Sequence, residues 1–365
     1  MNRPVILLGN GIRNNPALIE YLCGLGIPIL TTWMAIDLLP ENHPSFCGRP
    51  GVLGQRAANI IQQKATHLYC LGARLDEQQV AYRYDNFAPK AEKYVFDIDQ
   101  VELDKLPDTW RRMKANPFTN MIMIRASSSW LSWCKSLYTR LRPELDGVDN
   151  PDYVDPFRFV YLLSDYAQPD DIIISGAGKA GEILCQAFKV KQGQRFQTLS
   201  TNGAMGNDIP LSIGAAIASG RRVLCVTGDG GFQLNTQELE VVRRLKLNIQ
   251  FFVHSNRGYG SIRQMQLARF GNVVGADPES GFTMPTLAEI ADCYGLRYQR
   301  IETLTCPNDA DYIPEFDGQI IELMIDPDYV HYPRVATALV DGKWVQDSME
   351  DMTPRLAELE GLMNE

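Results

Sequence analysis

The sequence predicts an α/β protein that contains two doubly wound, parallel-sheet (Rossmann-like) domains. Short continuous apolar runs alternate with stretches of helical periodicity, which is typical of parallel strands covered by helices on both faces. A chain of 365 residues is long enough for two or three domains. A cluster of Asp, Gly, Asn and Pro at 146–152 favours an exposed turn between them. We therefore expect a first domain over residues 1–145 and a second over residues 146–365.

The first domain is predicted from apolar runs that alternate with helical stretches. The expected strands are 5–8, 27–30, 67–71 and 94–96, and the expected helices are 16–25 and 55–63. Residues 104–145 are rich in Trp, Arg and Lys and are predicted to form a helical connection. Gly9-Asn10-Gly11 follow the first run, but Asn14 replaces the third glycine of a dinucleotide-binding motif. A tight turn explains the two glycines at least as well, so a nicotinamide dehydrogenase built on them is the weakest hypothesis.

The second domain is predicted to repeat this pattern from about Pro156 and to end in a C-terminal tail. The expected strands are 172–174, 223–226, 249–253 and 320–325, with a helix at 287–294.

Composition and charge indicate small-molecule ligands. The chain has 35 Lys plus Arg against 44 Asp plus Glu, a net charge of −9, and no basic block that would favour nucleic acid or an anionic membrane. No apolar run is long enough to span a membrane, and no signal cleavage site is apparent. The eight cysteines form no CxxC pair and are expected to be reduced core residues. We expect a cytoplasmic protein.

The segment over residues 223–239 has the strongest functional pattern. An apolar strand leads into Gly228-Asp229-Gly230-Gly231, and a helix follows. Its apolar positions are expected on one face: Leu234, Leu239, Val242 and Leu245. Glycines let a ligand approach the backbone, and the free N–H groups of such a loop and helix start can hold phosphate oxygens. The pattern therefore predicts a diphosphate site.

Asn256 follows the next predicted strand, 27 residues after Asp229. This separation suits one helix, one strand and two turns, so neighbouring parallel strands would bring both side chains to one sheet edge. Carboxylate, amide and carbonyl oxygens suit Mg²⁺. Either motif alone is more often an ordinary turn, and on the residues alone the two interpretations are about equally supported.

This Gly-Asp-Gly motif, followed by Asn256 and then a glycine, resembles the metal and diphosphate motif of thiamine-diphosphate-dependent enzymes. Residues 193–216 are similar to the preceding segment in acetolactate synthase-like members. Residues 9–11, 37–40, 72–76 and 97–99 resemble their central domain. The resemblance implies a central domain over 1–145 and a thiamine-diphosphate-binding domain over 146–365.

The resemblance also implies roles for individual residues. Mg²⁺ would be bound by Asp229, the Asn256 side chain and the Gly258 carbonyl, and diphosphate by the glycine turn (Gly228, Gly230 and Gly231). Met205 matches the residue that holds the cofactor bent, and the Gly203 carbonyl matches the acceptor for its 4′-amino group. Without the cofactor, Met205 would be an ordinary core methionine.

The resemblance implies an enzyme that decarboxylates a 2-oxo acid, with carboligation as a further step. Gly178 and Lys179 occupy a loop where acetolactate synthases carry Gln-His; Lys179 could pair with diphosphate or be a solvated helix residue. Met265 replaces the Trp that shapes the acceptor pocket, so the acceptor is not specified. Arg263 could bind a substrate carboxylate or form a salt bridge. Some relatives hold FAD in the central domain, which nothing in this sequence specifies.

No glutamate of this sequence matches the activating glutamate of the family, which lies in a pyrimidine-binding domain. We expect that domain on a partner chain of a dimer or tetramer, or a truncated sequence. The alternative is a non-catalytic cofactor-binding or regulatory subunit. His254 is expected to be a packed strand residue rather than a base.

Overall fold

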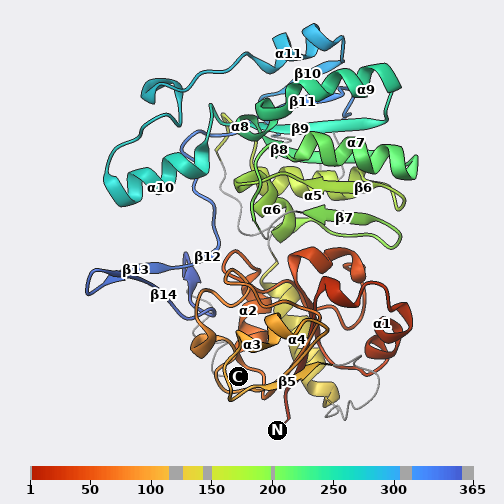
Figure 1. Cartoon of the computed structure of the whole chain (residues 1–365), viewed down its shortest axis with the longest axis vertical. Helices are drawn as coiled ribbons and strands as arrows, with labels where there is room; N and C mark the ends of the chain where they lie inside the picture. The colour runs from red at the N-terminus through yellow and green to blue at the C-terminus, as the bar shows by residue number, and fades with distance from the viewer. Residues whose placement is uncertain (1, 115–125, 143–149, 199–201, 305–314, 356–365) are drawn as a thin grey trace. The chain divides into compact units, whose positions relative to one another are not determined.

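The computed structural model describes residues 2–114, 126–142, 150–198, 202–304 and 315–355. The chain divides into two compact units, Met1–Asp146 with Tyr332–Glu365, and Gly147–His331. Each unit is built on a parallel sheet with flanking helices (Figure 1). The predicted α/β class with two doubly wound sheets is therefore confirmed.

The first unit contains a five-stranded parallel sheet with the order β2-β1-β3-β4-β5. Its strands are β1 (Pro4–Leu8), β2 (Ile29–Thr31), β3 (His67–Leu71), β4 (Glu92–Asp97) and β5 (Arg111–Lys114). Its helices are α1 (Pro16–Cys23), α2 (Arg56–Gln63), α3 (Gln100–Asp104) and α4 (Ser128–Arg140). The predicted helical connection was wrong in part, since β5 lies within it. This edge strand reads Arg-Arg-Met-Lys and has no fully buried residue, so no apolar run marks it.

The turn at Gly9-Asn10-Gly11 packs directly against the loop that follows β3. The N–H groups of Gly9 and Gly11 donate to the carbonyls of Leu71 (2.9 Å) and Gly72 (3.0 Å). A Cβ on Gly9 would lie 2.0 Å from the Gly72 carbonyl oxygen. The glycines therefore permit two backbones to touch, and their N–H groups are not free to bind the phosphate of a dinucleotide.

The C-terminal segment packs on helix α2. Every residue of α2 is buried, including its polar ones. Asn59 hydrogen-bonds both the N–H and the carbonyl of Gly51, and its amide also reaches the sulfur of Met352 (3.3 Å). Arg56 donates to the Met352 carbonyl. These contacts place residues 332–355 with the first unit, whereas the second domain is predicted to run to residue 365. The physical reason is that the buried polar side chains of α2 need hydrogen-bond partners, which this segment supplies.

The C-terminal segment contributes two small antiparallel pairs. They are β12 (Arg334–Val335) with β15 (Met352–Thr353), and β13 (Thr337–Val340) with β14 (Lys343–Gln346).

The second unit contains a six-stranded parallel sheet with the order β10-β11-β9-β8-β6-β7. Its strands are β6 (Ile172–Ser175), β7 (Arg195–Thr198), β8 (Val223–Gly228), β9 (Ile249–Ser255), β10 (Tyr298–Ile301) and β11 (Ile320–Met324). Its helices are α5 (Pro156–Tyr166), α6 (Lys179–Ala187), α7 (Asp208–Ser219), α8 (Asp229–Phe232), α9 (Leu239–Leu245), α10 (Gly260–Phe270) and α11 (Leu287–Tyr294). The four predicted strands are present, and the two that were not predicted, β7 and β10, are the polar edge strands.

Alternate residues of the central strands face two helical layers. Ile174, Cys225 and Phe251 belong to the core that packs under α7, α9 and α11. On the other face, Phe252 contacts Phe159 of α5, with ring centroids 5.4 Å apart. This alternation is what a sheet buried on both sides requires.

The helix predicted after the glycine motif is interrupted. Leu239 and Val242 are fully buried, but Leu234 and Leu245 are 44% and 43% exposed, so the predicted single apolar face is wrong. Asn235 has non-helical dihedral angles (φ −135°, ψ 33°) and divides the 3₁₀ segment Gln233–Glu238, which rotates Leu234 away from the later turns.

The cysteines and the hydropathy of the helices were also considered in the predictions. The described cysteines are all free, and five of the seven are buried; Cys306 lies outside the described residues. In the same part of the chain, no helix combines the length and hydropathy needed to cross a membrane.

Candidate active site

A pocket of about 280 Å³ lies at the carboxyl edge of the second sheet. From β6 the chain moves outward to β7, whereas from β8 it moves to β9 on the opposite side. The loops after β6 and β8 therefore diverge and leave a crevice, which is where doubly wound sheets bind ligands. Every residue predicted for the site lines this pocket: Gly178, Lys179, Gly203, Met205, Gly228, Asp229, Gly230, Gly231, Asn256 and Gly258.

The pocket collects three helix N termini. The first residues of α6, α8 and α10 all line it. N–H groups in a first helical turn have no acceptor within the helix, and the helix dipole adds partial positive charge. Two acidic side chains, Asp229 and Glu182, also line the pocket. The three helix N termini favour an anionic ligand such as a diphosphate.

The glycine motif forms the start of a helix rather than a loop. Helix α8 begins at Asp229, with Gly228 as its N-cap in an extended conformation. A Cβ on Gly230 would lie 2.5 Å from the Tyr259 ring. That ring packs on Phe282 (centroids 4.3 Å apart), and its hydroxyl accepts a hydrogen bond from Gln233. Gly230 therefore lets an aromatic side chain close over the turn.

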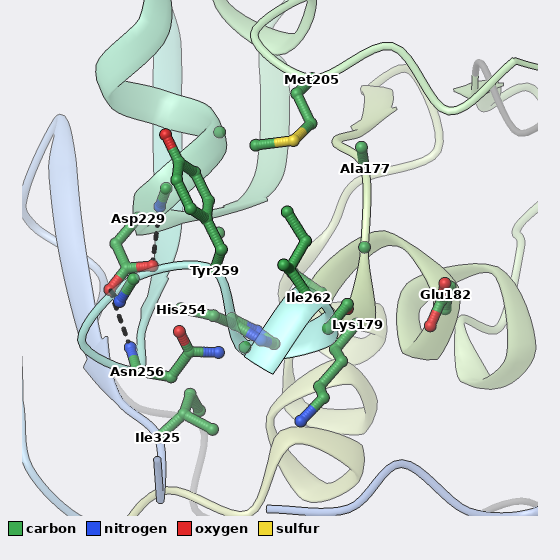
Figure 2. A pocket seen from close by; sticks show the side chains of 18 of the residues that line it. Ala177, Lys179, Glu182, Met205, Asp229, His254, Asn256, Tyr259, Ile262 and Ile325 are labelled. Carbon is green, nitrogen blue, oxygen red and sulfur yellow. Dashed lines mark hydrogen bonds between the residues drawn. The ribbon is translucent and has the colours of Figure 1, made fainter. Parts of the chain in front are cut away.

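Asp229 joins the ends of β8 and β9. Its carboxylate is 1% exposed and accepts hydrogen bonds from the N–H groups of Asn256 (3.0 Å), Gly258 (3.1 Å) and Gly230 (2.7 Å). Gly258 has φ +132°, and a Cβ there would lie 2.5 Å from the Ala276 carbonyl oxygen, so only glycine fits this turn. The predicted adjacency of Asp229 and Asn256 is observed (Figure 2).

Three oxygen-bearing groups converge beside this turn. One terminal atom of the Asn256 amide lies 3.3 Å from Asp229 Oδ1 and 2.9 Å from the Gly258 carbonyl oxygen. An amide nitrogen at this position would donate to both oxygens, whereas an amide oxygen there requires a cation between the three. In the described residues no group of three His, Cys, Asp or Glu side chains could hold a metal, so a metal would need amide and carbonyl oxygens. This set fits Mg²⁺.

Burial dominates the electrostatics of Asp229. It raises the pKa of the carboxyl to about 7, against the opposing effect of the N–H groups of Gly230, Gly258, Asn256 and Arg257. A cation beside the carboxylate would favour its charged form.

Comparison with known proteins agrees with this geometry. Residues 1–114 match the family described as "Thiamine pyrophosphate enzyme, central domain". Residues 176–311 match "Thiamine pyrophosphate enzyme, C-terminal TPP binding domain". The chain belongs to the thiamine pyrophosphate enzymes. Thiamine pyrophosphate is the same compound as thiamine diphosphate.

Relatives within the thiamine pyrophosphate enzymes are named acetolactate synthases. The chain is 29% identical over 350 residues to acetolactate synthase isozyme 1 large subunit of Escherichia coli K12, covering 91% of this chain and 60% of the relative. It is 26% identical over 352 residues to acetolactate synthase large subunit of Lactococcus lactis, covering 92% and 60%. A probable acetolactate synthase large subunit of Methanocaldococcus jannaschii is 29% identical over 319 residues, covering 82% and 53%. The chain thus spans 60% or less of these relatives.

Met205 and Lys179 both line the pocket, but Met205 is partly exposed whereas the Lys179 ammonium group is hydrogen-bonded. Met205 is 40% exposed, so it is not a core methionine. Lys179 donates to the Tyr329 carbonyl, which also accepts from Gln264 (3.3 Å). Its ammonium group is therefore turned toward the segment after β11. Lys179 itself is the first residue of α6 and lines the pocket (Figure 2).

Some residues that line the pocket were not among the predicted site residues. They are Pro156, Ala177, Ala180, Glu182, Ile183, His254, Tyr259, Gly260, Ser261, Ile262, Ile325 and Tyr329. Most are apolar or adjoin a motif, and only the sheet topology brings them together. Arg263 was predicted either to bind a substrate carboxylate or to form a salt bridge, and it lies 3.7 Å from Asp277, as in the second alternative.

His254 is packed, as expected, but it also lines the pocket. Its imidazole is 3% exposed and meets the Phe159 ring edge-on at 5.6 Å. Burial lowers the pKa of His254 to about 3, so the ring is neutral.

Proposed function

We propose that this chain binds thiamine diphosphate and Mg²⁺, and that the protein it serves decarboxylates a 2-oxo acid, with carboligation as a further step. The observation that carries the proposal is the convergence of every predicted cofactor and metal residue on one pocket at the switch point of the second sheet. The membership of both domains in the thiamine pyrophosphate enzymes supports it.

Each part of the pocket has a role in this proposal. The oxygens of Asp229, Asn256 and Gly258 would hold Mg²⁺, and the first turns of α6 and α8 would bind the diphosphate through N–H groups. The Gly203 carbonyl and Met205 would hold the organic half of the cofactor in position. Bound thiamine diphosphate supplies a carbon nucleophile and an electron sink for decarboxylation. The residues that line the pocket would position the cofactor.

We further propose that the pyrimidine-binding half of the active site comes from outside these 365 residues. The two family matches are to the central and C-terminal domains, and the relatives are longer than the matched region. The missing half would be a partner chain in an oligomer or a further segment of the same polypeptide. FAD in the first unit, which some relatives hold, stays a hypothesis.

Calorimetry with thiamine diphosphate and Mg²⁺ tests the cofactor site. We expect saturable, Mg²⁺-dependent binding that Asp229→Ala abolishes, because the variant removes the charged metal ligand and the acceptor of three N–H groups. Asp292→Ala, at a position outside the pocket on α11, is the control and should bind like the parent. Equal binding by Asp229→Ala and the parent would show that the metal assignment is wrong.

Catalysis is tested separately by mixing the chain with a pyrimidine-binding domain and measuring CO₂ release from 2-oxo acids. We expect release only from the mixture. Cofactor binding without CO₂ release from any mixture would instead favour a non-catalytic cofactor-binding or regulatory subunit.

A further inference from the structure

His254 lines the pocket from near the carboxyl end of strand β9, at what we call the floor of the pocket. It lies near the carboxyl end of β9, where its Cα pairs with Gly228 of β8 and Leu323 of β11. Its ring faces the layer that contains α5, as the contact with Phe159 shows. The first turn of α6, at Lys179 and Ala180, lines the same pocket. His254 therefore lies under the place where the helix N termini converge.

The imidazole carries an unpaired buried nitrogen. His254 Nε2 has no hydrogen-bond partner among the described residues, although only 3% of the residue's surface is exposed. Buried polar atoms in native proteins nearly always have a partner, and an unpaired one is destabilising. Since His254 lines the pocket, a ligand in that pocket can supply the missing partner.

The position of the ring indicates which part of a ligand it meets. Asn256 follows the end of β9, two residues after His254, and both residues line the pocket. Figure 2 shows the His254 ring between Asn256 and Lys179, whereas Met205 lies at the other end of the pocket. An anion held between the first turns of α6 and α8 would thus reach the ring, and the organic half of the ligand would lie toward Met205.

We infer that His254 is a further ligand-contacting residue, whose Nε2–H donates a hydrogen bond to a diphosphate oxygen. A neutral imidazole has one N–H, and because a diphosphate oxygen at neutral pH accepts hydrogen bonds, the ligand selects the tautomer protonated at Nε2. The inference rests on the proposed function and adds a contact to it.

Binding of two probes to His254 variants tests the inference. The probes are thiamine diphosphate and inorganic diphosphate, each with Mg²⁺, measured by calorimetry on the full chain. His254→Leu should weaken both by about 10- to 100-fold, the range for a hydrogen bond to a charged group. His254→Gln, whose amide reaches the position of Nε2, should bind within a few-fold of the parent. His254→Asn, whose shorter amide does not, should resemble His254→Leu.

The control is Phe252→Leu, which alters the same strand and the same contact with Phe159 but does not line the pocket. It should change the unfolding temperature without changing affinity for either probe. If His254→Leu does not fold, the Gln and Asn variants give the same contrast.

The inference is overturned if His254→Leu and His254→Asn bind inorganic diphosphate like the parent. This holds even if the two variants bind thiamine diphosphate more weakly, because the proposed contact is to the diphosphate. It fails alone if Asp229→Ala abolishes binding while the His254 variants bind normally. If the parent binds no thiamine diphosphate, or Asp229→Ala binds it equally well, the proposed function fails instead.

Discussion

Two buried carboxyl groups lie near the pocket, and their surroundings give them different tasks. Asp229 lines the pocket and accepts three backbone N–H groups. Asp208 does not line it; its carboxyl accepts from the Thr227 hydroxyl and from the N–H of Ile209. Burial raises the pKa of Asp208, as it does for Asp229. Asp208 therefore anchors the first turn of α7 to β8, while Asp229 is available to a ligand.

The raised pKa of Asp208 predicts a pH-dependent stability. In the pH range above the ordinary pKa of 3.8, the folded state holds this proton more tightly than the unfolded state, so stability falls as pH rises through the folded pKa. Asp208→Asn removes this ionisation and keeps an oxygen that can accept a hydrogen bond. As the pH rises above 3.8, we expect the free energy of unfolding of Asp208→Asn to fall less than that of the parent. Urea unfolding of both proteins across this range measures the difference, and a steeper decline in the variant would contradict the argument.

At the scale of secondary structure, the break after α8 connects two walls of the pocket. Asn235, at the break, donates from Nδ2 to the Gly206 carbonyl at 2.6 Å and accepts from Gln237. Gly206 follows the segment that carries Gly203 and Met205. The irregular turn thus fixes that segment to the helix that begins at Asp229, and regular helix geometry would not place the amide there.

Removing this connection should loosen the wall that carries Met205. Asn235→Ala leaves the Gly206 carbonyl without its donor, so we expect a loss of about 1 kcal/mol in the free energy of unfolding. We also expect thiamine diphosphate to bind about 5- to 10-fold more weakly, because binding must then order the segment. Gln237→Ala is the control, since among the described residues its exposed amide donates a hydrogen bond to Asn235 Oδ1 alone. Calorimetry and urea unfolding check both values, and equal affinities in the two variants would refute this role.

The secondary structure also shows which strands a sequence reveals. Apolar runs predicted β1, β3, β8, β9 and β11, whose residues are mostly or fully buried. The edge strands β5, β7 and β10 carry alternating or polar side chains. These segments form strands because they pair with a neighbouring strand rather than because they are buried, so no local sequence pattern predicted them.

At the scale of the whole molecule, the two units use the same topology differently. In the first sheet, the loops at the switch point between β1 and β3 touch through Gly9 and Gly72. In the second, the loops after β6 and β8 leave a pocket of about 280 Å³. The described loops of the second switch point therefore leave space for a ligand between them, whereas those of the first are in contact at Gly9 and Gly72.

This difference predicts where a cofactor stabilises the molecule. Thiamine diphosphate with Mg²⁺, at 100 times its Kd, should raise the free energy of unfolding by about 2.7 kcal/mol. Amide hydrogen exchange should slow at residues 228–231 and 256–260 of the second unit and stay unchanged in β1 and β3. EDTA should reverse the protection. Protection confined to the first unit, or insensitive to EDTA, would contradict this placement of the site.

Local patterns in the sequence were sufficient to predict the fold class and to propose the chemistry of the site. Continuous apolar runs and helical stretches are local signals, and the Gly-Asp-Gly motif lies with its strand and helix within a single short segment. The spacing to Asn256 was also readable, because one helix and one strand have nearly fixed lengths.

The remaining features depend on long-range contacts in the folded chain. Strand order brings Gly178, Met205, Asp229 and Asn256 to one pocket, although they are far apart in the chain. It also leaves the Nε2 atom of His254 unpaired at the pocket floor and places residues 332–355 on helix α2. These features depend on which side chains each segment meets after packing, and such long-range contacts leave no local periodicity in the sequence.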